Sequence, residues 1–371
     1  MAGLKGLIFL WCLLFHGNVF SQRLFSEHRD GLDLGIHPDN RNYLREVLSK
    51  PEAIESLFED FAKTYDKDYL NHAEKKRRLQ IFESNLKKYA KRNEEEKGTA
   101  VYGVDQFSDL TEEEFERKFL TFRPDAFKKS SYEFYDSHEL IKPGKKVPKN
   151  FDWVTKGVVS PVKHQGGCAS CWAFSTVANL EGLYALKNKK LVTFSEQQLV
   201  DCDKVNDGCA GGWMSDAVDY IKNATGLMTS DDYPYAGKNQ NCTFDPAKVA
   251  VKVKANRMLP RNERKILNYL YKHGPISVAI DGQAMSGYRG GIAHPPESKC
   301  LKADKYVNHA ITLVGFGVET FVINGEKLRM PYWIAKNSYG TEFGWKGYYY
   351  FYRGDNTCGV HNYASSAVLA R

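Results

Sequence analysis

Three segments of this chain, far apart in sequence, carry side chains that together could make a reactive thiol. Cys171 opens an apolar run with helical spacing and follows Gln165 and Cys168. His309 lies 138 residues after Cys171, and Asn337 lies 28 residues after His309. A thiol attacks a carbonyl only as the thiolate, and the positive end of a helix dipole lowers its pKa. With an imidazole as base and an amide to orient it, this set predicts a nucleophilic cysteine.

The spacing of Cys168 and Cys171 also occurs in zinc sites and in dithiol redox centres. A zinc site would need a second close pair of ligands, and Cys202 and Cys209 are too far apart for the usual spacing. A thioredoxin-like site would need a strand–helix–strand context, which the pattern around Cys171 lacks. The nucleophile is therefore the preferred interpretation, and its chemistry needs no metal ion and no organic cofactor.

The first 21 residues have the composition of a secretory signal peptide. Lys5 supplies the positive start, residues 6–15 are apolar, and residues 19–21 suit cleavage before Gln22. The apolar run is too short to span a bilayer, and no later segment is apolar enough to do so. A signal anchor is the alternative, but we expect a secretory route that ends in the lysosome or outside the cell.

The cysteine count fits this route. The chain has eight cysteines, and Cys12 would leave with the signal peptide. An odd remainder in an oxidising compartment predicts either an intermolecular bridge or one free thiol. Three bridges and a free Cys171 satisfy the second possibility. The remaining cysteines are Cys168, Cys171, Cys202, Cys209, Cys242, Cys300 and Cys358.

Length and charge set further bounds. The 371 residues are enough for two or more domains with their own cores. The net charge of +7 comes from scattered basic residues without a nucleic-acid-binding motif, so we interpret them as a solvated surface.

The first part of the chain reads as helical. Residues 52–65 and 72–96 have apolar side chains at helical spacing. Thr111 and Glu114 form a capping box, which predicts a third helix towards Phe119. Residues 121–146 contain prolines and paired lysines, a composition typical of an exposed linker that proteases cut.

After residue 147, helical patterns precede strand patterns. Helices are expected at 171–187, 195–201, 213–224 and 262–272. Strands are expected at 276–280, 310–316, 331–336, 347–352 and 364–369, with Asn324-Gly325 as a tight hairpin turn. Helices followed by an antiparallel sheet predict an α+β fold with two subdomains.

From about residue 52 to its end, the chain resembles a papain-like cysteine protease precursor of the cathepsin L and cathepsin F-like group. Besides the segments around Cys171, His309 and Asn337, the match includes residues 202–212 and 288–292. Two pro-region motifs also match, with Tyr89 where isoleucine is usual and Asp105 where asparagine is usual. Their other matching residues are Glu74, Arg78, Phe82, Asn85, Asn93, Gly103, Phe107 and Asp109.

The resemblance implies a papain-like fold with a helical left subdomain and an antiparallel β-barrel-like right subdomain, preceded by a helical inhibitory pro-region. It implies a signal peptide at 1–21, a pro-region at 22–146 with its inhibitory part at about 52–120, and a peptidase domain at 147–371. The implied activity is that of a cysteine endopeptidase made as a zymogen.

By the same resemblance, Cys171 is the nucleophile, and His309 is the base and later the acid. Asn337 orients the imidazole, and Gln165 donates its amide to the oxyanion beside the backbone N–H of Cys171. Taken alone, His309 would fit a packed core histidine and Asn337 a turn residue. The implied bridges are Cys168–Cys209, Cys202–Cys242 and Cys300–Cys358.

The resemblance also implies an apolar second specificity pocket. We expect it to prefer Leu or Val, to respond poorly to Arg, and to reject Phe if Tyr363 fills its floor. The pro-region has no cysteine and no extra cysteines mark a blocking loop, so an endopeptidase is favoured over an exopeptidase. The implied substrate-binding residues are Gly211, Gly212, Trp213, Met214, Ala279, Val307, Asn308 and Tyr363.

Departures from the family pattern favour a second interpretation, a catalytically impaired homologue that binds peptides or proteins. Ala169 stands where glycine is usual. Tyr339 and Phe343 stand where tryptophans are usual, so the bond between Asn337 and His309 should be shielded less completely. A third interpretation is a pro-region that inhibits other proteases.

Expected partners are protein or peptide substrates, the chain's own pro-region as an intramolecular inhibitor, and cystatin-like inhibitors. We expect a monomer that binds no nucleic acid. Acidic pH should release the pro-region by protonating carboxylates such as Asp105 and Asp109. Asn223 and Asn241 begin glycosylation sequons, which fits the secretory route.

Overall fold

The structure is a computed structural model that describes residues 43–120, 133–134, 147–323 and 326–370. The expected signal peptide, most of the expected linker and the Asn324-Gly325 turn lie outside the described residues.

The N-terminal part folds into four described helices, α2 (Tyr43–Leu48), α3 (Pro51–Thr64), α4 (His72–Glu95) and α5 (Glu112–Phe119). The three predicted helices are confirmed to within one residue, whereas α2 was not predicted. The Asn71 side chain caps α4 by accepting from the backbone N–H of Glu74. At α5 the capping box is complete, because Thr111 and Glu114 each accept from the other's backbone N–H.

A central helix, α6 (Cys171–Asn188), opens the C-terminal part and is buried on most of its surface. Helices α7 (Glu196–Cys202) and α8 (Met214–Asn223) pack against it. The short strands β4 (Leu227–Met228) and β5 (Val249–Val251) pair with each other in an antiparallel ladder. Helix α9 (Glu263–His273) follows the N-cap Asn262 and ends at Gly274, whose positive φ suits glycine. These predicted helices are also confirmed.

The main sheet has the strand order β11-β10-β9-β7-β12-β6-β2, and β3 (Phe151–Asp152) pairs with β9. All of its pairings are antiparallel except that of β2 with β6. Within the described residues the sheet is open, because β11 and β2 do not pair with each other, so the right subdomain is not a closed barrel. The α+β class is confirmed. The remaining bounds are β2 (Glu133–Phe134), β6 (Val253–Met258), β7 (Ile276–Ile280), β9 (His309–Ile323), β10 (Glu326–Lys336), β11 (Tyr348–Tyr352) and β12 (Ala364–Leu369).

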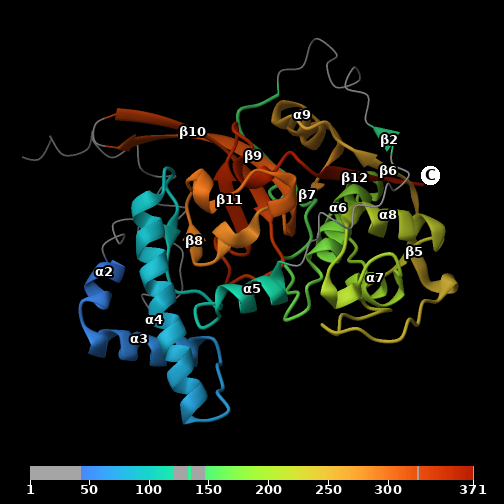
Figure 1. Cartoon of the computed structure of the whole chain (residues 1–371). Helices are drawn as coiled ribbons and strands as arrows, with labels where there is room; N and C mark the ends of the chain where they lie inside the picture. The colour runs from blue at the N-terminus through green and yellow to red at the C-terminus, as the bar shows by residue number, and fades with distance from the viewer. Residues whose placement is uncertain (1–42, 121–132, 135–146, 324–325, 371) are drawn as a thin grey trace, which may run out of the picture.

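Figure 1 shows α2, α3 and α4 on one side of the molecule, α6, α7 and α8 on the other, and α5 between the two groups. Short 3-10 helices connect the elements of the C-terminal part. They are η4 (Gly208–Ala210), η5 (Pro246–Lys248), η6 (Gly282–Met285), η7 (Glu297–Lys299), η8 (Asp304–Tyr306) and η9 (Thr357–Gly359).

The N-terminal part docks on the C-terminal part through backbone hydrogen bonds. Strand β1 (Val101–Tyr102) pairs antiparallel with β8 (Tyr288–Gly290). The backbone N–H groups of Thr99 and Ala100 both donate to the carbonyl of Ile292, at 2.9 and 3.1 Å. In this form of the chain, the pairing with β1 therefore satisfies backbone N–H and C=O groups along the edge of β8.

Side chains of α4 complete this docking surface. Arg92 donates to the carbonyls of Ser286 and Gln283, at 2.5 and 2.8 Å. The hydroxyl of Tyr89 lies 3.2 Å from that of Ser286, and both residues are buried. The atypical tyrosine in the pro-region motif is thus a contact between the two parts of the chain.

Candidate active site

The candidate nucleophile lies at the first residue of α6. Cys171 is fully buried, and the N-cap Ser170 makes no side-chain cap bond to the helix. The unpaired N–H groups of a first helical turn carry partial positive charge, which favours a thiolate at this position.

Sheet register brings the candidate base and its orienting amide together. His309 begins β9, and Lys336 ends β10 opposite Thr312, so Asn337 emerges beside the start of β9. The Nε2 atom of His309 lies 2.9 Å from Oδ1 of Asn337. Both residues are buried, so water does not compete for this hydrogen bond.

Gln165 is held beside the same strand end. Its backbone N–H donates to the carbonyl of Ser338 at 2.9 Å, and its Oε1 accepts from the Ser338 hydroxyl at 2.7 Å. The amide Nε2 donates to the carbonyl of Cys168 at 3.0 Å. These bonds fix the side-chain amide next to the first turn of α6.

Burial sets the protonation of the pair in this form of the chain. It raises the pKa of the Cys171 thiol to about 11, against the lowering effect of nearby backbone N–H groups. It lowers the pKa of His309 to about 4, against the hydrogen bonds to Asn337 and the Phe119 carbonyl. At neutral pH both the thiol and the imidazole are therefore neutral.

The end of α5 covers this pair. The carbonyl of Phe119 lies 3.2 Å from Nδ1 of His309, and the next residue, Leu120, is buried. A Cβ on Gly282 would lie 2.6 Å from Leu120 Cδ2 and 2.7 Å from His309 Cβ, so this contact leaves no room for a side chain. The N-terminal part therefore closes the approach to the candidate base.

An aromatic wall surrounds the imidazole. The ring of Tyr339 lies 5.0 Å from that of His309. Around Tyr339 lie the rings of Phe107, Phe115, Phe119 and Phe343, at centroid distances of 5.1, 6.2, 5.5 and 5.3 Å. Tyr339 and Phe343 are fully buried. Three of these phenylalanines come from the N-terminal part and add to the cover of the imidazole in this form of the chain, so the weaker shielding expected of Tyr339 and Phe343 themselves stays a prediction.

The expected specificity-pocket residues belong to the same buried cluster as Cys171. Trp213, Met214, Ala279, Val307 and Tyr363 belong to one buried cluster that also contains Cys171. The rings of Trp213 and Tyr363 meet edge to face at 4.9 Å.

The remaining expected substrate-binding residues lie at turns around this cluster. Asn308 accepts from the backbone N–H of Gly282 at 2.8 Å. Gly211 has a φ of +122°, and a Cβ on Gly212 would lie 2.8 Å from Trp172, so both positions favour glycine.

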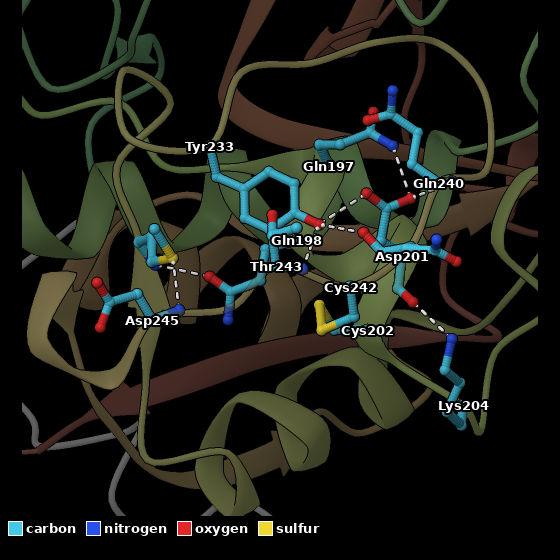
Figure 2. The surroundings of a disulfide bond; sticks show 12 residues. Gln197, Gln198, Asp201, Cys202, Lys204, Tyr233, Gln240, Cys242, Thr243 and Asp245 are labelled. Atoms are coloured by element: carbon cyan, nitrogen blue, oxygen red, sulfur yellow. Dashed lines mark hydrogen bonds between the residues drawn. A yellow bond between two sulfur atoms is a disulfide. The ribbon is translucent and has the colours of Figure 1, made fainter.

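The disulfides are Cys168–Cys209, Cys202–Cys242 and Cys300–Cys358, the three implied pairs. Cys171 is the free cysteine among those that the structure describes. Figure 2 shows the Cys202–Cys242 bond, where Tyr233 donates to Asp201 at 2.8 Å and the Gln240 backbone donates to the same carboxylate at 2.7 Å. The sequon residues Asn223 and Asn241 are both exposed.

Sequence reasoning missed a buried ionic network behind the site. Lys163 pairs with Glu181 at 2.8 Å and with Glu196 at 2.7 Å. Lys336, the residue before Asn337, donates to the Ser160 hydroxyl at 2.7 Å, and that hydroxyl donates to Glu181. Burial lowers the pKa of Lys336 to about 8. These charged residues are far apart in the sequence, and no motif or spacing predicts that they form one network.

The described part of the chain shows neither a membrane-spanning helix nor a metal-ligand cluster. No helix there is long and apolar enough to cross a membrane. No group of three or more His, Cys, Asp or Glu side chains in the described ranges is arranged to hold a metal ion.

Fold and site together define a two-part protein in which a helical N-terminal segment covers a Cys–His–Asn site. Residues 147–368 match the model of the papain family cysteine proteases, and residues 58–115 match the cathepsin propeptide inhibitor domain. The chain therefore belongs to the papain family of cysteine proteases.

Among its relatives, cathepsin F of Mus musculus is 43% identical over 84% of this chain and 64% of its own length. Cathepsin F of Drosophila melanogaster is 41% identical over 86% of this chain and 51% of its own length. This chain thus spans half to two thirds of these relatives. The solved structure of digestive procathepsin L2 from Tenebrio molitor larval midgut has a TM-score of 0.77 and 32% identity, covering 85% of this chain and all of that one.

Proposed function

We propose that the chain is the zymogen of a cysteine endopeptidase that hydrolyses peptide bonds through an acyl-enzyme on Cys171. The observation that carries this proposal is the bonded pair of His309 and Asn337 under the backbone carbonyl of Phe119, next to a buried Cys171 whose thiol is approached by the backbone N–H of Ala310. A covered, neutral pair is the arrangement expected of a latent enzyme.

Activation follows from removing the cover. Departure of Phe119 and Leu120 admits water, which reduces the burial penalty on both charged forms. The proton of Cys171 then passes to Nδ1 of His309, which gives a thiolate and an imidazolium at the positive end of α6.

The chemical steps use the residues in turn. The thiolate adds to the peptide carbonyl, and the Gln165 amide and the Cys171 backbone N–H donate to the resulting oxyanion, each donor contributing about 3 kcal/mol in comparable sites. His309 protonates the amine as the C–N bond breaks, which leaves a thioester on Cys171. Water, deprotonated by His309, then releases the acid and restores the thiol. Asn337 keeps the imidazole oriented throughout.

The apolar cluster around Trp213 and Tyr363 supports a preference for Leu or Val at the second substrate position. The Arg261 guanidinium lies 5.5 Å from the Tyr363 ring and pairs with Asp304 at 2.8 Å, so the carboxylate near this ring already has a cationic partner. Profiling the processed enzyme with a dipeptide substrate library tests this part, and Arg or Phe as the preferred residue contradicts it.

The proposed organisation is a signal peptide at 1–21, a pro-region at 22–146 and a monomeric peptidase domain at 147–371. The secretory route to the lysosome or the exterior accounts for the disulfides and for exposed sequons at Asn223 and Asn241. Cystatin-like proteins are the proposed external inhibitors, and they would compete for the surface that the pro-region occupies.

The deciding experiment is titration of the acid-processed, reduced protein with an irreversible thiol-directed epoxide, beside a Cys171→Ser variant. We expect about one equivalent of label, with peptide cleavage lost in step with labelling and absent in the variant. A folded, fully processed protein that neither labels nor cleaves would favour the catalytically impaired, peptide-binding homologue.

A further inference from the structure

The hydroxyl of Tyr339 lies close to Nδ1 of His309, the nitrogen that takes the proton of Cys171 in the proposed mechanism. Its oxygen is 3.3 Å from Nδ1, and the two rings are tilted by 32°. The other ring nitrogen, Nε2, lies 2.9 Å from Oδ1 of Asn337. An amide oxygen only accepts, so Nε2 carries the hydrogen and the neutral ring keeps its lone pair at Nδ1.

Two groups face that lone pair, and one of them can donate to it. The Phe119 carbonyl, 3.2 Å away, is an acceptor and cannot pair with a lone pair. The Tyr339 hydroxyl can donate to Nδ1, and it also lies 3.4 Å from the Phe119 carbonyl, a second acceptor that is present only while the N-terminal part covers the site. Burial raises the Tyr339 pKa well above its usual value, so the hydroxyl keeps its proton. Phe107 and Phe119 of the N-terminal part pack against the Tyr339 ring in this form of the chain, and Phe343 packs against it from the C-terminal part.

We propose that Tyr339 is a positioning residue for the base, whose hydroxyl donates to Nδ1 of neutral His309 and competes there with the proton of Cys171. This inference rests on the proposed peptidase function. In the covered form the hydroxyl is shared between Nδ1 and the Phe119 carbonyl, and burial keeps the pair neutral. After removal of the pro-region, it stabilises the deprotonated imidazole, so activity is lost at a lower pH on the alkaline side than it would be without the hydroxyl.

Other titratable groups near this bond come from three segments of the described chain. Cys171 faces it from α6, and Asp105 acts on Tyr339 from the pro-region. His164 forms a backbone bridge with Tyr339, and its ring nitrogens are engaged by the Gly166 N–H and by Gln106. Asp105 and Gln106 depart with the pro-region, whereas Cys171 and His164 remain with the mature enzyme.

The test compares the pH dependence of kcat/KM for the processed wild type and Tyr339→Phe, which keeps the ring and removes the hydroxyl. The alkaline limb is expected to move up by about 0.7 of a pH unit, roughly a fivefold change in the acid constant, as a neutral hydrogen bond would give. Tyr349→Phe is the matched control, because the Tyr349 hydroxyl is buried and has no hydrogen-bond partner among the described residues. Its profile should coincide with the wild type.

An alkaline limb that stays in place or moves down in Tyr339→Phe overturns the proposal, even though cleavage itself would support the protease function. If that variant fails to fold, the bond is tested by 15N NMR of the full-length Cys171→Ser chain at neutral pH. We expect His309 to carry its hydrogen on Nε2, with Nδ1 as a hydrogen-bond acceptor, and the opposite tautomer overturns the proposal. A wild type that neither labels nor cleaves defeats the proposed function, while the NMR result still decides on the bond.

Discussion

Replacing Glu114 by glutamine should loosen the helix that covers the active site. Arg78 of α4 pairs with Glu114 of α5 at 2.6 Å and with Glu74 at 2.7 Å, and it also donates to the Asp109 carbonyl. Helix α5 ends at Phe119, whose carbonyl contacts Nδ1 of His309. This ion pair therefore helps to keep α5 in the position that covers His309. The substitution keeps the shape of the side chain and removes its charge.

The size of the effect follows from the pKa of Glu114. Burial alone would raise this pKa, but the hydrogen bonds from Arg78 and from the Thr111 backbone outweigh it and lower the pKa from 4.5 to about 2. This difference corresponds to roughly 3 kcal/mol of pro-region stability, which we reduce to about 2 kcal/mol because the Arg78 and Glu114 side chains are 14% and 17% exposed. The folded-state pKa is depressed, so the stabilisation is complete above pH 4.5 and is lost as the pH falls through about 2.

The assay is urea unfolding of the pro-region in the processing-deficient Cys171→Ser chain, with and without Glu114→Gln, at pH 7 and near pH 2. We expect a loss of about 2 kcal/mol at pH 7 that nearly disappears near pH 2, and earlier processing of the active variant on acidification. Glu94→Gln is the matched control, because its pair with Arg45 is half exposed on both sides and should contribute under 1 kcal/mol. Equal losses at both pH values, or equal effects of the two substitutions, would refute the reasoning.

Three further predictions concern docking and specificity. Asp105→Asn should shift processing to lower pH or leave it unchanged. Burial raises the Asp105 pKa, so the docked pro-region takes up a proton at this residue. Processing at a higher pH than the wild type, measured by gel, contradicts this. Arg92→Met should weaken inhibition of the mature enzyme by the separate pro-region at least tenfold, measured as an inhibition constant, since two carbonyls lose their donor. Tyr363→Ala should admit Phe at the second substrate position and raise its kcat/KM relative to Leu; an unchanged ratio would show that Tyr363 does not form the floor.

The Asp105 prediction corrects one expectation from sequence. Protonation of Asp105 was expected to release the pro-region, but its carboxylate is fully buried and accepts from the Gly287 N–H at 2.6 Å. Since burial raises its pKa, acid favours the docked state at this residue. Glu114, whose pKa moves the other way, is the better source of acid sensitivity within the pro-region.

Local signals explain why most of the fold was predictable from sequence. The capping box at Thr111, the helical spacing of residues 52–65 and 72–96, and the glycine at 274 each act within one or two turns of chain. Helix α2 is short and gives no such signal, and β1 and β8 are strands only because they pair with each other across the two parts of the chain.

The site was predictable to the extent that residue type carries its chemistry. Cys171, His309, Asn337 and Gln165 were predicted from their segments, and the structure adds the distance between His309 and Asn337 and the bonds that hold Gln165. The covering carbonyl of Phe119 and the network around Lys163 were not predictable, because a backbone atom and isolated charges become significant only through contacts between distant segments.

The buried ionic network has a mechanical consequence. The proposed nucleophile, Cys171, belongs to α6, whereas the proposed base, His309, and the amide of Asn337 lie at the ends of sheet strands. The separation of the Cys171 sulfur and the His309 ring therefore depends on how rigidly α6 is joined to the sheet. Glu181 of α6 is tied, through the Ser160 hydroxyl, to Lys336, the residue beside Asn337. Charged contacts are directional, unlike apolar ones, and they resist sliding of one body over the other. We therefore expect the separation of the Cys171 sulfur and the His309 ring to depend on a network in which none of the proposed substrate-binding residues takes part.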